Sequence, residues 1–166
     1  MSAYRGGTVF IRKTKSAFTL VEILIVVIIL GILAAIVIPR FANASKDAKR
    51  AALSQQLNSI RVQIQLYTVE HGDTRPPNLG ANNWTDLTTQ SLWKTTTRGP
   101  YLPSVPVNTL NGYTGIAVVA TDPSWGDPVA GANIGFVYNS ANGFMYGTTT
   151  AGNKVYNEAN PLDPNN

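Results

Sequence analysis

A single carboxylate, Glu22, precedes a long apolar stretch near the start of this 166-residue chain. The sixteen residues from Ile23 to Ile38 include no polar side chain. A charged group within a membrane helix is costly, about 2.5 to 3.5 kcal/mol for an acidic side chain at the helix centre, and such residues tend to be functional. In surroundings poor in water, attraction between opposite charges is much stronger than in bulk water. We therefore expect Glu22 to act by pairing with a positive charge.

Other kinds of chemistry have little support in the sequence. The chain has no cysteine, which excludes disulfides, thiolate metal sites and cysteine nucleophiles. Its one histidine, His71, lies at the expected C-terminal end of a helix, where a cation is favoured by the helix dipole. Neither a phosphate-binding loop nor the glycine motif of dinucleotide-binding proteins is present, and no G-x-S-x-G context places a serine nucleophile. We predict that the protein is not an enzyme.

The apolar stretch admits two interpretations. From Phe18 to Ile38 it has 21 positions, with Thr19 and Glu22 as the only polar side chains. At about 1.5 Å per residue, this is long enough to cross a bilayer core of about 30 Å. The triplet Ala42-Asn43-Ala44 offers the alternative, because a signal peptidase that cuts after Ala44 would release a soluble protein.

The block that begins at Lys15 and continues as Ser-Ala-Phe-Thr-Leu-Val-Glu resembles the processing signal of type IV pilins and type II secretion pseudopilins. The resemblance implies that residues 1–17 are a leader, that a prepilin peptidase cuts between Ala17 and Phe18, and that the new amine of Phe18 is methylated. It also implies that the apolar helices stack into a filament, where Glu22 meets the Phe18 amine of a neighbouring subunit. Ala17 is a departure, because the family usually has glycine before the cut.

Removal of this leader would change the charge of the protein. The precursor carries 13 basic and nine acidic residues, for a net charge of +4. Four of the basic residues precede the expected cut and all nine acidic residues follow it, so the mature chain is neutral. A nucleic-acid partner is therefore not expected. Basic residues flank both ends of the apolar stretch and leave its orientation undecided. The resemblance implies a single-pass protein of the bacterial inner membrane with its C-terminal domain in the periplasm.

The pattern beyond the apolar stretch predicts an α+β protein of the type IV pilin kind. Residues 18–39 form a transmembrane helix that continues, amphipathic, through residues 40–72, or else Pro39 separates two helices. Residues 73–166 form a C-terminal region of loops and a small antiparallel sheet, packed on the second half of the helix. The predicted elements are a short helix at 85–92 and strands at 115–121, 134–139 and 143–149. The predicted stripe of the helix that faces the sheet contains Ala48, Ala52, Leu53 or Leu57, Ile60, Ile64 and Tyr67.

A second short match concerns the choice among filaments. The segment Gly-Pro-Tyr-Leu at 99–102 resembles a stretch that precedes the sheet in major pseudopilins. We therefore expect a structural subunit of a helical filament, most like the major pseudopilin of a type II secretion system. The resemblance implies a homo-oligomeric filament, and as partners minor pseudopilins, the peptidase, and the assembly platform and ATPase. A type IV pilus pilin that acts in adhesion, motility or DNA uptake is the alternative. A soluble protein, secreted after a cut behind Ala44, is the third interpretation.

A calcium site is the one cofactor that the sequence suggests. Asp122 and Asp127 lie in a Pro- and Gly-rich loop between two predicted strands, and Asn133 ends that loop. The resembling major pseudopilins bind calcium in a loop of this position. Carboxylate, amide and carbonyl oxygens are the ligands that this ion prefers, although the loop has no fixed ligand spacing of the EF-hand kind.

Overall fold

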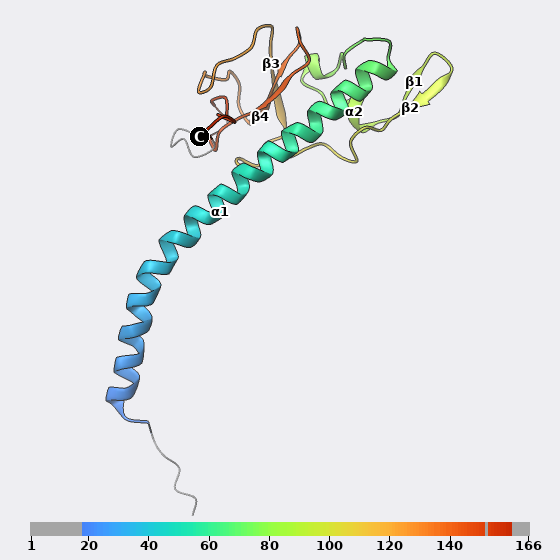
Figure 1. The fold of residues 1–166 in the computed structure, drawn as a ribbon. Coiled ribbons are helices and arrows are strands. Elements are labelled where there is room, and N and C mark those ends of the chain that lie inside the picture. Colours follow the sequence, from blue (N-terminus) through green and yellow to red (C-terminus); the bar gives the residue numbers. More distant parts are fainter. Residues whose placement is uncertain (1–17, 152, 161–166) are drawn as a thin grey trace, which may run out of the picture. The chain divides into compact units, whose positions relative to one another are not determined.

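The computed structural model describes residues 18–151 and 153–160 (Figure 1). It divides into two compact units, Met1–Ala42 and Asn43–Asn166. One helix, α1 (Leu20–Glu70), contributes to both units and continues through Pro39. The prediction of one long helix is therefore confirmed, and the alternative of two helices separated by Pro39 is wrong. The uninterrupted run of helix-compatible residues on both sides of Pro39 outweighs the one hydrogen bond that proline removes.

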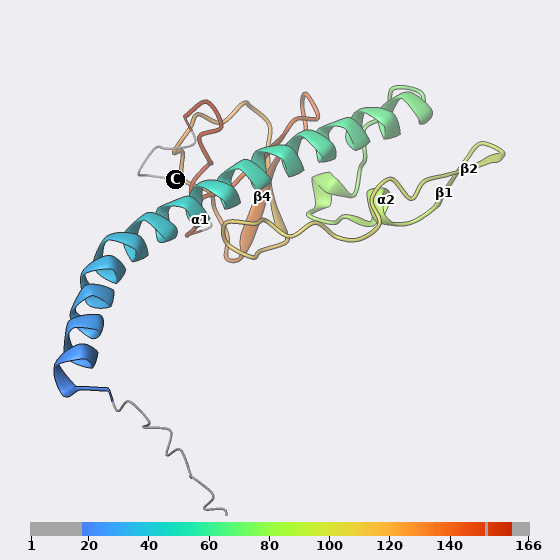
Figure 2. The ribbon, with the colours of Figure 1, turned by 60° about the horizontal axis from the view of Figure 1, so that its bottom comes forward.

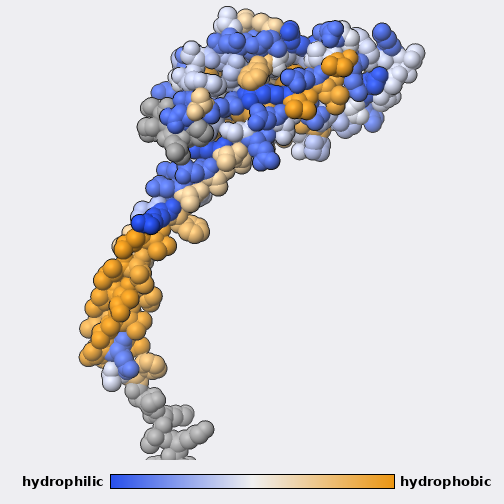
Figure 3. Space-filling view, viewed as in Figure 1, coloured by the Kyte–Doolittle hydropathy of each residue, from blue (hydrophilic) through white to orange (hydrophobic). Residues whose placement is uncertain are grey.

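In the first unit, the helix has no polar side chain from Ile23 to Ile38, and the face seen in Figure 3 is hydrophobic along this stretch. Its large side chains are all exposed, from Leu20 at 82% to Ile38 at 66%. By length and composition, this helix is able to cross a membrane. A helix that is hydrophobic all round is stable only where lipid or other protein covers it.

In the second unit, α1 is amphipathic and lies across the sheet, as Figures 1 and 2 both show. The buried stripe consists of Leu53, Leu57, Ile60, Ile64 and Tyr67. These positions recur every three or four residues, which places them on one face of a helix. The stripe was predicted correctly from Leu53 onward. Ala48 and Ala52, also predicted to face the sheet, are exposed because the packing against the sheet begins at Leu53.

The sheet has three strands in the order β3–β4–β5, with bounds β3 (Gly115–Val119), β4 (Ile134–Asn139) and β5 (Met145–Gly147). The β4–β5 pair is an antiparallel hairpin, as predicted, and its turn closes with Gly143 at a φ of 79°. The pair β3–β4 is parallel, so the sheet is mixed where the sequence analysis predicted an antiparallel one. Residues 120–133 carry the chain back to the start of β4, a crossover of the dozen or so residues that parallel neighbours require.

Residues 73–114 contain more structure than the sequence predicted. The 3₁₀-helix η1 (Leu79–Ala81) and the single-turn helix α2 (Thr85–Thr88) precede a hairpin of β1 (Ser91–Trp93) and β2 (Thr96–Arg98) (Figure 2). The predicted helix at 85–92 is thus correct only in its first turn. The β-branched threonines of β2 and the left-handed conformation of Lys94 favour the hairpin instead.

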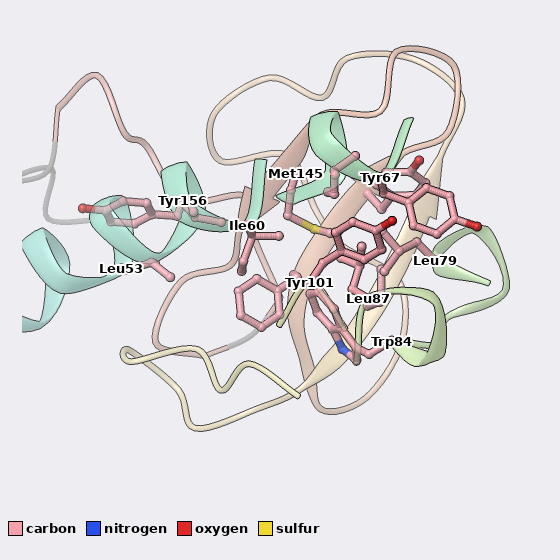
Figure 4. Close-up of a cluster of buried hydrophobic side chains, with 14 residues drawn as sticks. Leu53, Ile60, Tyr67, Leu79, Trp84, Leu87, Tyr101, Met145 and Tyr156 are labelled. Carbon is pink, nitrogen blue, oxygen red and sulfur yellow. The ribbon is translucent and has the colours of Figure 1, made fainter. Parts of the chain in front are cut away.

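Two hydrophobic clusters cover the two faces of the sheet. The larger one joins α1 to β4, β5 and the segment 79–101 (Figure 4). The smaller one, on the other face, consists of Val137, Tyr146 and Val155. Because Tyr146 is the partner of Val137, its side chain lies on the opposite face of the sheet from Phe136 and Tyr138. Val155, close to the end of the described residues, is buried and bridges to Thr148.

Candidate functional site

The first turn of α1 contains a reciprocal pair of hydrogen bonds between Thr19 and Glu22. The backbone N–H of Glu22 donates to the Thr19 hydroxyl, and the backbone N–H of Thr19 donates to the Glu22 carboxylate, each at 3.2 Å. The Thr19 hydroxyl also donates to the same carboxylate oxygen at 3.2 Å. This arrangement is a capping box, in which two backbone N–H groups that the helix leaves unsatisfied find partners. A carboxylate at this position is also favoured by the positive end of the helix dipole.

The surroundings of this pair are apolar and uncovered. Glu22 is the only charged residue between Leu20 and Pro39. Phe18, just before the cap, is 78% exposed, and the large side chains that follow it are exposed as well. The structure therefore has one locally hydrogen-bonded carboxylate at the start of an exposed apolar helix.

The predicted processing residues are only partly visible. Ala17 lies outside the described residues, and Phe18 is the first described residue. Thr19, which the structure brings against Glu22, was not singled out as a site residue. The spacing Thr-x-x-Glu ahead of an apolar run is the sequence signature of a capping box and could have identified it.

The two residues of the predicted calcium site are separately engaged. One oxygen of Asp122, Oδ1, accepts hydrogen bonds from Asn142 Nδ2 at 2.6 Å, Tyr146 Oη at 2.7 Å and Asn139 Nδ2 at 2.8 Å. Oδ2 of Asp127 accepts the backbone N–H of Ser124 at 2.7 Å. Within residues 18–151 and 153–160, no three His, Cys, Asp or Glu side chains gather to hold a metal ion. Calcium takes six to eight oxygen ligands. These residues, as they lie, do not fit that ion.

These contacts shift the pKa values of Asp122 and Tyr146 in opposite directions. The hydrogen bonds from Tyr146, Asn142 and Asn139 lower the pKa of the Asp122 carboxyl, because they favour its charged form. Burial, followed by the hydrogen bond to Asp122, raises the pKa of the Tyr146 hydroxyl to about 12. At neutral pH the pair therefore consists of a charged acceptor and a protonated donor.

His71 has the structural role that the sequence favoured. It is buried, its ring stacks on Tyr67, and Trp93 packs against it. Its Nδ1 lies 2.9 Å from the carbonyl oxygen of Tyr67 and its Nε2 lies 3.0 Å from the Ser91 hydroxyl. The carbonyl only accepts, so Nδ1 carries a proton. These two contacts join the β1–β2 hairpin to the end of α1.

The tryptophans divide between core and surface. Trp84 is buried and donates from Nε1 to the carbonyl of Thr114 at 2.7 Å, as expected of a core residue. Trp125 is 43% exposed and packs edge-on against Tyr146. It lies in the same loop as Asp122 and Asp127, so this loop contacts the hairpin through both an aromatic ring and a carboxylate.

Comparison with known proteins gives a family match over the segment that contains the first turn of α1. Residues 12–38 match the family model described as the prokaryotic N-terminal methylation motif. Over this N-terminal part the chain is similar to pilins and pseudopilins. The match covers the end of the expected leader, the expected cut and residues 18–38 of the apolar stretch, and thus the segment on which the resemblance was based.

Two curated relatives are similar over the same part of the chain. The type II secretion system core protein G of Pseudomonas aeruginosa is 37% identical over 60 residues, which are 36% of this chain and 42% of that protein. The major component of the type IV narrow pilus of Thermus thermophilus is 38% identical over 53 residues, which are 32% of this chain and 46% of that protein. The chain thus matches less than half the length of either relative. No solved structure gives a significant match.

Proposed function

We propose that this protein is a structural subunit of a helical filament, most like the major pseudopilin of a type II secretion system. The observation that carries the proposal is Glu22, a single carboxylate at the start of an apolar helix within a methylation motif. Similarity to core protein G of the secretion system supports the secretion branch. We infer a structural role and no enzymatic one.

The mechanism follows from the cost of leaving the apolar helix and its carboxylate uncovered. In the inner membrane, lipid covers the helix and the capping box holds Glu22. Cleavage before Phe18 creates a new amine one residue ahead of Thr19. On assembly, the helices of neighbouring subunits replace the lipid, and Glu22 pairs with the Phe18 amine of a neighbour. An unpaired charge in such surroundings costs several kcal/mol, so this pairing selects the correct axial register.

The partners and the location belong to the same proposal. A prepilin peptidase removes residues 1–17, and an assembly platform driven by an ATPase adds subunits. Minor pseudopilins share the filament. The C-terminal domain then lies in the periplasm, where the growing filament pushes cargo outward.

The first experiment is an intact mass and N-terminal sequence of the protein from its native membrane. A methylated chain that starts at Phe18 supports a filament subunit. A chain that starts at Ser45 makes it a secreted soluble protein and contradicts the proposal. Such a cut would fall inside α1, which favours the first result.

The second experiment replaces Glu22 by alanine or valine. Both variants should insert into the membrane and lose the leader as the natural protein does, because neither change touches the residues beside the cut. Filament assembly should fail, because the neighbour's amine loses its partner. Normal filaments from these variants would contradict the mechanism.

A type IV pilus pilin is the alternative, and similarity to the Thermus thermophilus pilus component favours it. The two functions differ in what a deletion strain loses. Loss of secreted proteins with intact surface pili indicates the secretion system. Loss of surface pili, adhesion or DNA uptake with intact secretion indicates the pilus.

A further inference from the structure

The orientation of the groups around Asp122 is fixed by backbone donors. The side-chain oxygen of Asn139 accepts the N–H of Ala141 at 2.8 Å, and that of Asn142 accepts the N–H of Phe144 at 2.8 Å. A backbone N–H can only donate, so each amide oxygen must face the backbone. The amide nitrogens of both asparagines are thereby directed at the Asp122 carboxylate.

The polarity of this arrangement is opposite to that of a cation site. A calcium ion is bound by oxygen atoms that converge on it. Here two amide N–H groups and one phenol O–H converge on one carboxylate oxygen. The hairpin thus offers a place for an anion, and Asp122 of the preceding loop fills it. All three donors come from β4, β5 and the turn between them.

Asp127 does not complete a cation site either. Its carboxylate accepts the N–H of Ser124, while its own N–H donates to the carbonyl of Ser124 at 3.1 Å. These two bonds close a short turn within the loop. The carboxylate that calcium would need as a second ligand is therefore used to shape the backbone.

We propose that hydrogen bonds to Asp122 fasten the loop 120–133 to the β4–β5 hairpin, and that this chain holds the loop in place without calcium. The loop connects the parallel strands β3 and β4, so its attachment also fixes the crossover between them. Trp125, packed on Tyr146, adds an apolar contact at the same place. The proposal does not depend on whether the filament serves secretion or a pilus.

The test is the thermal unfolding of the full mature chain in detergent, followed by circular dichroism. We expect the same Tm in millimolar calcium chloride and in excess EGTA. A saturable rise of Tm with calcium would overturn the proposal. Terbium, added as a probe for the same site, should give no luminescence sensitised by Trp125 or Tyr146. Sensitised emission that calcium displaces would also overturn it.

Tyr146→Phe separates the hydrogen-bonded attachment from a metal site. It removes one hydrogen-bond donor to Asp122 and leaves the aromatic ring in place. We expect Tm to fall by a few degrees, by the same amount with calcium and with EGTA. Tyr113→Phe is the matched control, because the Tyr113 hydroxyl has no hydrogen bond to any described residue, and it should leave Tm unchanged. If Tyr146→Phe has the Tm of the natural protein, the proposal fails.

Discussion

The Thr19 hydroxyl accepts the N–H of Glu22 while the Glu22 carboxylate accepts the N–H of Thr19, so the first turn of α1 closes on itself. The carboxylate on which assembly depends in the proposed function is thus hydrogen-bonded within the single subunit. Its local partners are neutral, whereas the amine of a neighbour would be charged. The carboxylate therefore has hydrogen-bond partners before assembly, and the charged amine of a neighbour would be a stronger partner.

Glu22→Gln separates these two roles of the carboxylate. Glutamine also closes a capping box, so the start of the helix should persist, but it carries no charge for the neighbour's amine. We expect processed, membrane-inserted protein and few or no filaments, as measured by the mass of the mature chain and by electron microscopy. Thr19→Ser, which keeps the hydroxyl, is the control and should assemble. Normal filaments with Glu22→Gln would mean that capping alone suffices.

Arg61→Ala should destabilise the C-terminal domain. The Arg61 guanidinium donates through Nη1 to Glu158 at 2.9 Å and through Nε to the carbonyl of Met145 at 2.8 Å, and the Arg61 and Glu158 side chains are only 12% and 17% exposed. Hydrogen bonds to charged, mostly buried groups contribute more than surface pairs, so we expect a loss of about 2 kcal/mol in the free energy of unfolding.

The matched control for this change is Arg50→Ala. Arg50 pairs with Asp47 at 3.3 Å, and the Arg50 and Asp47 side chains are 15% and 50% exposed. Because solvent screens the half-exposed Asp47 carboxylate, we expect this pair to contribute about 0 to 1 kcal/mol. Urea unfolding of both variants measures the contrast. Equal losses would show that the Arg61–Glu158 pair contributes no more than a surface pair.

The attachment of the loop should depend on pH at both ends of the range. The lowered pKa of Asp122 means that its stabilising effect is present above the unfolded value of 3.8 and is lost as pH falls through the folded value. The raised pKa of Tyr146 means that its effect is complete below the unfolded value of 10.0 and is lost as pH rises through about 12. The difference in Tm between the natural protein and Tyr146→Phe should thus be largest near neutral pH and narrow at both extremes. A difference that does not vary with pH would contradict this assignment.

Gly135→Ala should be among the most damaging small substitutions. A Cβ at this position would lie 2.1 Å from the carbonyl oxygen of Tyr113, and backbone atoms can yield only by moving the whole segment. We expect a loss of about 3 kcal/mol in the free energy of unfolding, as for severe overpacking. Gly80→Ala is the control, because a Cβ there would meet nothing within 4 Å. Chemical denaturation of the two variants should therefore give clearly different midpoints.

Local patterns in the sequence were enough to predict the long helix, most of its buried stripe, β4 and the β4–β5 turn. These elements depend on the period of their apolar residues and on turn chemistry, both of which can be read from neighbouring positions. The stripe from Leu53 to Tyr67 and the turn that ends at Gly143 are examples. Glu22 could be identified for the same reason. A single charge in an apolar stretch is a local pattern, which can be recognised without knowing which distant residues it contacts.

The tertiary structure alone decided which strands pair and what the polar loop residues contact. Local sequence does not encode whether β3 joins β4 in parallel, because the pairing depends on where the crossover 120–133 returns. Likewise, Asp122 is a plausible metal ligand by residue type, but its three donors lie 17 to 24 residues away along the chain. Their convergence on one oxygen gives the site the polarity of an anion pocket. The spacing of residue types along the sequence does not reveal this polarity, because the polarity depends on the direction in which each amide and hydroxyl points after folding.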